Sequence, residues 1–135
     1  MTDVRCKLTF ARLALVGLTV AGMGLVVPAT RAHHGWSWAN AEQTTLQGTI
    51  REVSMAPPHP SLRVADGDGT VWFVELGNPN QTERSGFTVT SAKPGDVITV
   101  LGNRHKDEAK KQMKAVRVTI AAKSYDLYPE RIRSK

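Results

Sequence analysis

The sequence predicts an all-β domain, a small five-stranded Greek-key barrel with one short helix between its third and fourth strands. Three observations lead to this prediction. Helical periodicity is nearly absent after residue 32, apolar and polar residues alternate in five short segments, and Gly, Pro, Asn and Asp residues separate those segments. The chain has 135 residues, which is enough for one such domain with appendages.

The first three strands are expected over residues 44–55, 61–66 and 71–76. In the first strand, Leu46 and Ile50 belong to one alternating pattern, and Val53 and Met55 continue it shifted by one residue. This shift near residues 51–52 indicates a β-bulge. The prolines of "APPHP" end it, because proline cannot donate to a strand ladder. The sequence "DGDG" then predicts a hairpin turn into the third strand. On that third strand, one side is expected to carry Trp72, Val74 and Leu76.

A short helix is expected over residues 79–85, because Asn78 suits a capping position, Pro79 a first helical position and Gly86 the residue past a helix end. The fourth and fifth strands follow at residues 97–102 and 115–121. Three strands, a helix and two strands is the order of an OB-fold, a five-stranded barrel whose first-to-second and fourth-to-fifth strand loops flank a binding face. A small β-sandwich is the alternative architecture for the same strands.

Residues 1–32 have the three-part organisation of a secretory signal peptide: basic residues, an apolar stretch from Leu13 to Val27, and small residues before a cleavage site after Ala32. The stretch is short for a membrane span, although retention as an anchor is the alternative. We therefore expect a periplasmic or secreted protein with no membrane span after cleavage. The expected organisation is a signal peptide (1–32), an N-terminal arm (33–43), the OB-fold-like domain (44–123) and a C-terminal tail (124–135). The single cysteine, Cys6, lies in the signal.

Charge argues against a nucleic-acid partner. The chain has 18 Lys and Arg against 12 Asp and Glu, but four of the basic residues and one acidic residue fall within residues 1–32, which leaves 14 against 11. A nucleic-acid footprint needs a strong basic stripe, whereas the basic cluster of residues 103–114 is interrupted by Asp107 and Glu108. Together with export, this modest charge predicts no nucleic-acid partner.

Histidines are the candidate metal ligands. Cleavage after Ala32 would place His33 and His34 at a free N-terminus, where an α-amine and imidazoles together suit Cu(II) best among divalent metals. His59 and His105 lie in the two loops that border one face of an OB-fold, so they are further candidate ligands. The hypothesis is a copper-binding protein that uses His33, His34, His59 and His105, with no catalytic residues.

Each candidate residue also has a plain structural interpretation. The histidine pair is then a hydrophilic start to the mature chain, His59 a turn residue and His105 a solvated one. Met55 and Met113, soft thioethers that suit Cu(I), are better explained as core fillers at strand ends. The tryptophans at positions 36, 38 and 72 are better explained as apolar cover for the barrel mouth than as ligand platforms.

The alternative function is therefore a metal-free OB-fold interaction module without a cofactor, whose partner is a peptide, a small ligand or an envelope protein. An enzyme is not expected, because a domain of this size shows no acid–base cluster and little room for a substrate cleft.

The segments "HHGWSW", "PPHP" and "VWFVELGNPNQTERSGFTVTSAKPGDVITVLG", with the valine-rich closing strand, resemble a family of small, exported, uncharacterised bacterial proteins. Members of that family have paired histidines after the signal peptide, an Asn-Pro-His before the second strand, and a Gly-aromatic pair followed by Lys-Pro-Gly-Asp. This chain has Pro57-Pro58-His59 in place of Asn-Pro-His, and Phe87 in place of the usual Trp. The resemblance covers most of residues 33–121, implies export and brings no established activity. More distantly, the chain resembles periplasmic OB-fold proteins, which are mainly binding modules.

Overall fold

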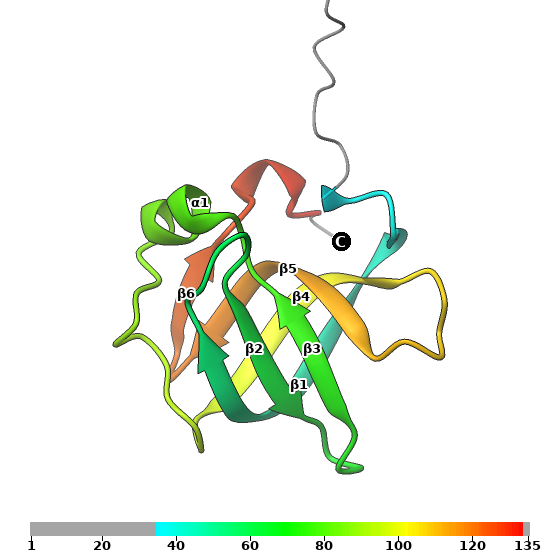
Figure 1. Cartoon of the computed structure of the whole chain (residues 1–135), viewed down its shortest axis with the longest axis horizontal. Coiled ribbons are helices and arrows are strands. Elements are labelled where there is room, and N and C mark those ends of the chain that lie inside the picture. The colour runs from blue at the N-terminus through cyan, green and yellow to red at the C-terminus, as the bar shows by residue number, and fades with distance from the viewer. Residues whose placement is uncertain (1–34, 134–135) are drawn as a thin grey trace, which may run out of the picture. The chain divides into compact units, whose positions relative to one another are not determined.

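The computed structural model describes residues 35–133, which form a β-barrel with helical segments at one end (Figure 1). The strands are β1 (Ala39–Ser54), β2 (Ser61–Ala65), β3 (Val71–Glu75), β4 (Val97–His105), β5 (Gln112–Ile120) and β6 (Lys123–Asp126). The helix α1 (Pro79–Arg84) lies between β3 and β4, and the 3₁₀ helix η2 (Pro129–Arg131) follows β6. Within this part of the chain, no helix is long and apolar enough to cross a bilayer.

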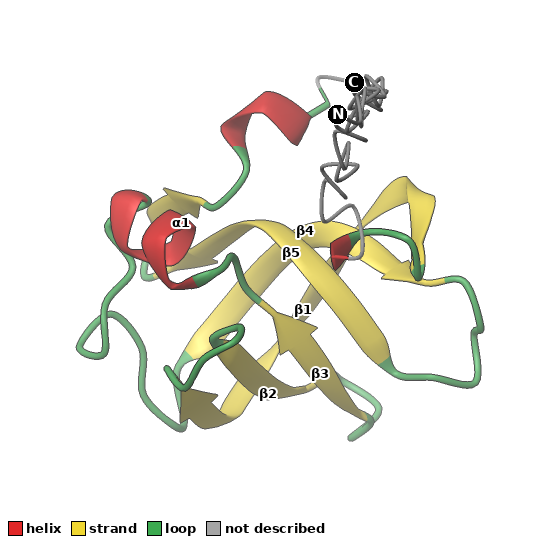
Figure 2. Cartoon of the chain, turned by 45° about the horizontal axis from the view of Figure 1, so that its top comes forward, coloured by secondary structure: helices red, strands yellow, loops and turns green. Residues whose placement is uncertain are grey.

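The sheet closes on itself. Its strands are ordered β3-β2-β1-β4-β5-β6 with antiparallel neighbours, and an additional parallel pairing of β3 with β5 joins the first five strands into a ring. Figure 2 shows these strands wrapping around one interior. This closure confirms the predicted OB-fold-like barrel with a short helix between its third and fourth strands.

The long strand β1 belongs to both halves of the barrel. Its first part pairs with β4 and its last part with β2, and the register shifts between Ile50 and Glu52, which confirms the predicted bulge. Gly48 lies just before this bend, where a Cβ would be 2.3 Å from the carbonyl oxygen of Ala65. Glycine is therefore needed where two backbones approach so closely.

Local turn chemistry works as predicted. In the β2–β3 hairpin, one carboxylate oxygen of Asp66 accepts the amide N–H groups of Asp68 and Thr70, each at 3.0 Å. Asn78 caps α1 by accepting the N–H of Gln81 at 2.9 Å, and Gly86 follows the helix with a φ of +83°. These elements depend on side chains only a few residues apart.

The barrel interior is apolar and continues under the C-terminal segment. Ile50, Val74 and Phe87 have no exposed surface, and Phe87 contacts Tyr125 of β6 edge to face, with ring centroids 5.3 Å apart. The C-terminal segment packs onto the domain through Tyr125, Leu127 and Tyr128, all three of which are buried. Strand β6 itself was not anticipated from the sequence, and β1 begins earlier than the expected residue 44.

Candidate functional site

A buried ion pair lies at the seam where the barrel closes. Glu75 of β3 and Lys114 of β5 are opposite each other in the parallel pairing, and the Lys114 ammonium donates to the Glu75 carboxylate. Their exposed fractions are 9% and 1%. Removing two charges from water costs free energy that their attraction only partly returns, so such a pair is weak evidence for stability and calls for another explanation.

Aromatic rings cover this ion pair. Trp36 and Tyr128 meet edge to face with ring centroids 4.9 Å apart, and the Lys114 nitrogen lies 5.8 Å from each ring centroid. A Cβ placed on Gly35 would lie 4.0 Å from the same nitrogen. The first described residues and the C-terminal segment, far apart in sequence, therefore form one cover over Lys114.

His59 reaches the same carboxylate from the β1–β2 loop. Its Nε2 lies 3.8 Å from a carboxylate oxygen of Glu75, and its Nδ1 is buried without a hydrogen-bond partner among the protein atoms of the described chain. The loop is held against β3, because the carbonyl oxygen of Pro60 accepts the Leu76 N–H at 2.8 Å. One imidazole nitrogen is thus directed to a carboxylate, while the other has no hydrogen-bond partner among residues 35–133. We call Glu75, Lys114, His59, Trp36 and Tyr128 the seam cluster.

The electrostatics of the seam cluster appear most clearly at Tyr128. Burial, together with the negative charge of Glu75, raises the pKa of the Tyr128 hydroxyl to about 12. Both causes disfavour a second anion beside the Glu75 carboxylate. The seam cluster therefore disfavours an additional negative group.

The four histidines of the predicted copper site fall into three groups. His33 and His34 lie outside the described residues. His59 belongs to the seam cluster, whereas His105, at the end of β4, stacks on Trp38 with ring centroids 5.4 Å apart and accepts the Asp107 N–H through Nδ1 at 2.9 Å. Across residues 35–133, no group of three or more His, Cys, Asp or Glu side chains is arranged to hold a metal ion. The four-histidine copper site stays a prediction.

The structural interpretations of the methionines and of one tryptophan hold. Met113 has no exposed surface and belongs to the core, and Met55 packs partly buried against it. Trp72 is buried, and its indole N–H donates to Asp66 at 2.9 Å, which holds the pKa of that carboxyl below its ordinary value.

Sequence reasoning missed Glu75 and Lys114 as members of a site. Both residues lie within apolar strand sequences, "VWFVEL" and "MKAVRV", and a charge at such a position is the signal that could have drawn attention to them. Residues 103–114 were instead expected to form a polar loop, whereas β4 extends to His105 and β5 begins at Gln112.

A second polar region surrounds the β4–β5 loop. A pocket of about 300 Å³ there is lined by three basic residues, Arg104, Lys110 and Lys111, by two acidic residues, Glu42 and Glu108, and by Trp72. The Arg104 guanidinium lies 4.6 Å from the Trp72 ring centroid. On the outer surface of β2 and β3, Arg63 lies over the Phe73 ring at 4.9 Å.

A model of a family of unknown function, DUF6152, matches residues 22–114. The chain belongs to this family. No curated protein matches the sequence.

Two solved structures are similar to this DUF6152 member in fold. A chain of the Stn1–Ten1 complex from S. pombe is 18% identical with a TM-score of 0.50, and the match covers 60% of this chain and 59% of that one. The mitochondrial single-stranded DNA-binding protein Rim1 from S. cerevisiae is 12% identical with a TM-score of 0.44, and the match covers 59% of this chain and 93% of that one. At these identities the likeness concerns the fold alone.

The exclusion of nucleic acid as a partner is wrong, because the chain has an OB-fold-like barrel, the fold it shares with a chain of the Stn1–Ten1 complex, and this fold binds oligonucleotides through its strands and loops. The exclusion depended on net charge, which does not record how charges group in space. In the structure, Arg104, Lys110 and Lys111 gather around one pocket, where the carboxylates of Glu42 and Glu108 offset part of their charge. OB-folds use such basic surfaces with aromatic side chains for single strands.

Proposed function

We propose that this DUF6152 member is an exported, non-catalytic OB-fold binding module that binds Cu(II) at the seam cluster, through His59 and the N-terminal His33 and His34. The observation that carries the proposal is the buried Nδ1 of His59, which has no partner in the described chain. A buried polar atom without a partner costs about 1–3 kcal/mol, so a ligand that fills this position is favoured. A neutral imidazole nitrogen is a good donor to Cu(II).

The surroundings of His59 suit a metal ligand. Metal-binding histidines commonly direct their second ring nitrogen toward a carboxylate, which orients the ring, and Glu75 occupies that position at 3.8 Å from Nε2. The positive charge of Lys114 does not oppose a cation strongly, because Glu75 pairs with it. His59 and its neighbours therefore fit one ligand of a copper site.

The position of Gly35 in the chain supports His33 and His34 as the remaining ligands. Gly35 lies near the Lys114 ammonium, Lys114 contacts Glu75, and Glu75 lies beside His59. His34 precedes Gly35 directly, and consecutive Cα atoms are only about 3.8 Å apart. His33 and His34, which lie outside the described residues, are proposed as the remaining ligands because they directly precede Gly35 in the sequence. His105 is left out of the site because its Nδ1 already accepts a hydrogen bond.

The test is calorimetric titration of Cu(II) into protein that begins at His33, beside His59→Ala and a form with one extra N-terminal residue. His105→Ala is the matched control, because it removes a histidine outside the seam cluster. We expect His59→Ala to weaken binding at least tenfold, about 1.4 kcal/mol, and the control to leave it unchanged. No binding by the parent protein, or equal losses in His59→Ala and His105→Ala, would contradict the proposal. Mass analysis of the exported protein checks the start at His33.

A second candidate function is a metal-free interaction module for single-stranded nucleic acid. The observation that favours it is Phe73, whose ring faces outward on β3 under Arg63, beside the lysine-rich β4–β5 loop. A base can stack on such a ring while lysines contact phosphates. Fluorescence anisotropy with labelled oligo(dT) tests it: Phe73→Ala should weaken binding and added salt should reduce it, whereas His59→Ala should have no effect.

A further inference from the structure

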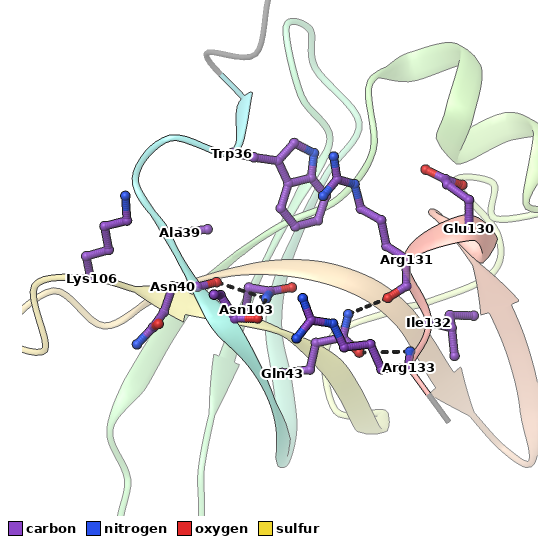
Figure 3. A pocket seen from close by; sticks show the side chains of 11 residues that line it. Trp36, Ala39, Asn40, Gln43, Asn103, Lys106, Glu130, Arg131, Ile132 and Arg133 are labelled. Atoms are coloured by element: carbon purple, nitrogen blue, oxygen red, sulfur yellow. Dashed lines mark hydrogen bonds between the residues drawn. The ribbon is translucent and has the colours of Figure 1, made fainter. Parts of the chain in front are cut away.

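A groove separate from the His59 imidazole opens between the start of β1, the end of β4 and the C-terminal segment (Figure 3). Its volume is about 520 Å³, which is within the range of small-molecule sites. Figure 3 shows Trp36, Asn103, Arg131 and Arg133 around this hollow. The groove brings together residues from both ends of the described chain.

Asn103 forms the floor of the groove and has an unused acceptor. Its side-chain nitrogen donates to three successive backbone carbonyl oxygens, those of Asn40 at 2.9 Å and of Ala41 and Glu42 at 3.2 Å each. Because carbonyls only accept, these contacts determine which way the amide points. The side-chain oxygen is then buried without a hydrogen-bond partner among residues 35–133, and the whole residue is only 6% exposed. The described chain therefore leaves an acceptor of fixed direction in the lining of the groove without a donor.

The rim of the groove is cationic and held in place. Gln43 fixes the C-terminal segment by donating to the Arg131 carbonyl at 2.6 Å and accepting the Arg133 N–H at 3.3 Å. The Arg131 guanidinium lies 4.2 Å from the Trp36 ring centroid, so its position is also restricted. The groove is lined by three cationic side chains, those of Lys106, Arg131 and Arg133, and by one carboxylate, that of Glu130. An anionic group is therefore favoured at the rim.

We propose that the groove binds a free α-amino acid with an apolar side chain. Its ammonium donates to the Asn103 oxygen, its carboxylate pairs with Arg133 and Arg131, and its side chain lies against Trp36 and Ile132. Two of these contacts use features that the described chain leaves unsatisfied, an acceptor without a donor and an excess of positive charge, and the third uses the apolar side chains in the lining. The proposal is independent of copper.

The test is NMR titration of metal-free ¹⁵N-labelled protein with L-phenylalanine. Two matched compounds separate the required groups: 3-phenylpropionate keeps the carboxylate without the ammonium, and phenethylamine keeps the ammonium without the carboxylate. We expect L-phenylalanine to shift the Asn103 side-chain NH₂ signals and to bind about tenfold more tightly than either compound. An absence of shifts at Asn103, or equal binding by 3-phenylpropionate, would overturn the proposal.

Variants at the rim complete the test without disturbing Asn103, whose side chain also supports β1. Arg133→Gln removes a charge from the groove, and Arg51→Gln removes one from the exposed bulge of β1 as the matched control. Arg133→Gln should weaken binding about tenfold, as expected for the loss of a charge-assisted contact, while Arg51→Gln leaves it unchanged. Equal effects of the two variants would show nonspecific charge attraction and contradict the site.

Discussion

The barrel interior and the seam cluster are both largely excluded from water, but they are built from opposite chemistry. The interior holds aliphatic and aromatic side chains such as Ile50, Val74 and Phe87, none of them exposed. The seam cluster holds an ion pair, Glu75 with Lys114, and an imidazole nitrogen without a partner. Apolar burial stabilises the fold directly, whereas a buried ion pair returns little net stability. The difference indicates that the interior maintains the barrel, whereas the seam cluster, which returns little net stability, is where we propose that a ligand binds.

The largest expected effect is in the interior. Phe87→Ala would leave a cavity beside Tyr125 and remove a fully buried ring, so it should lower the free energy of unfolding by about 3–5 kcal/mol. Urea denaturation measures this change. Val89→Ala is the control, because Val89 is 70% exposed and its loss should have almost no effect. A loss below about 1 kcal/mol for Phe87→Ala would contradict the assignment of the interior as the source of stability.

A somewhat smaller effect is expected at the seam. Lys114→Met leaves the Glu75 carboxylate buried without its partner, which should cost about 3 kcal/mol of unfolding free energy. The double variant Lys114→Met with Glu75→Met replaces the whole pair by apolar side chains, and it should recover most of that loss. If the double variant were as unstable as the two single variants combined, the ion pair would be a main source of stability and the comparison would fail.

The smallest effect concerns the hydroxyl of Tyr128. Its pKa in the folded protein is raised to about 12 by burial and by Glu75, above the ordinary value of about 10. A raised pKa contributes stability that is fully present below pH 10 and is lost as pH rises toward 12. Ultraviolet absorbance should therefore show a late tyrosine ionisation that Tyr128→Phe removes. Persistence of that late ionisation in Tyr128→Phe would assign it to another group.

The elements that sequence reasoning predicted correctly depend on neighbouring residues. The bulge after Ile50, the hairpin at Asp66 and the helix capped by Asn78 each involve contacts over a few positions, so the pattern that predicts them is local. The order of these elements was then enough to predict an OB-fold-like barrel. Strand β6 was missed because the two-residue turn that joins it to β5 consists of Ala121 and Ala122, which have positive φ angles, so no Gly, Asn or Asp marked a hairpin there.

Sequence reasoning identified His59 as a candidate ligand but not its surroundings. Loop positions suggested that His59 and His105 meet at one face, yet each contacts different groups: Glu75 beside the first, Trp38 and Asp107 beside the second. The Asn103 groove had no signal in the sequence, because an asparagine with an unused oxygen looks like any other asparagine until its three backbone contacts are known.

By itself, the amino-acid sequence determined five of the six strands, the turns between most of them and their order as an OB-fold, since alternation and turn chemistry act between near neighbours. The tertiary structure alone decided which distant residues share a site. Glu75 meets Lys114 only because β3 and β5 close the ring, and Trp36 meets Tyr128 only because both ends of the described chain cover that seam. Such contacts follow from barrel closure, which no local pattern records.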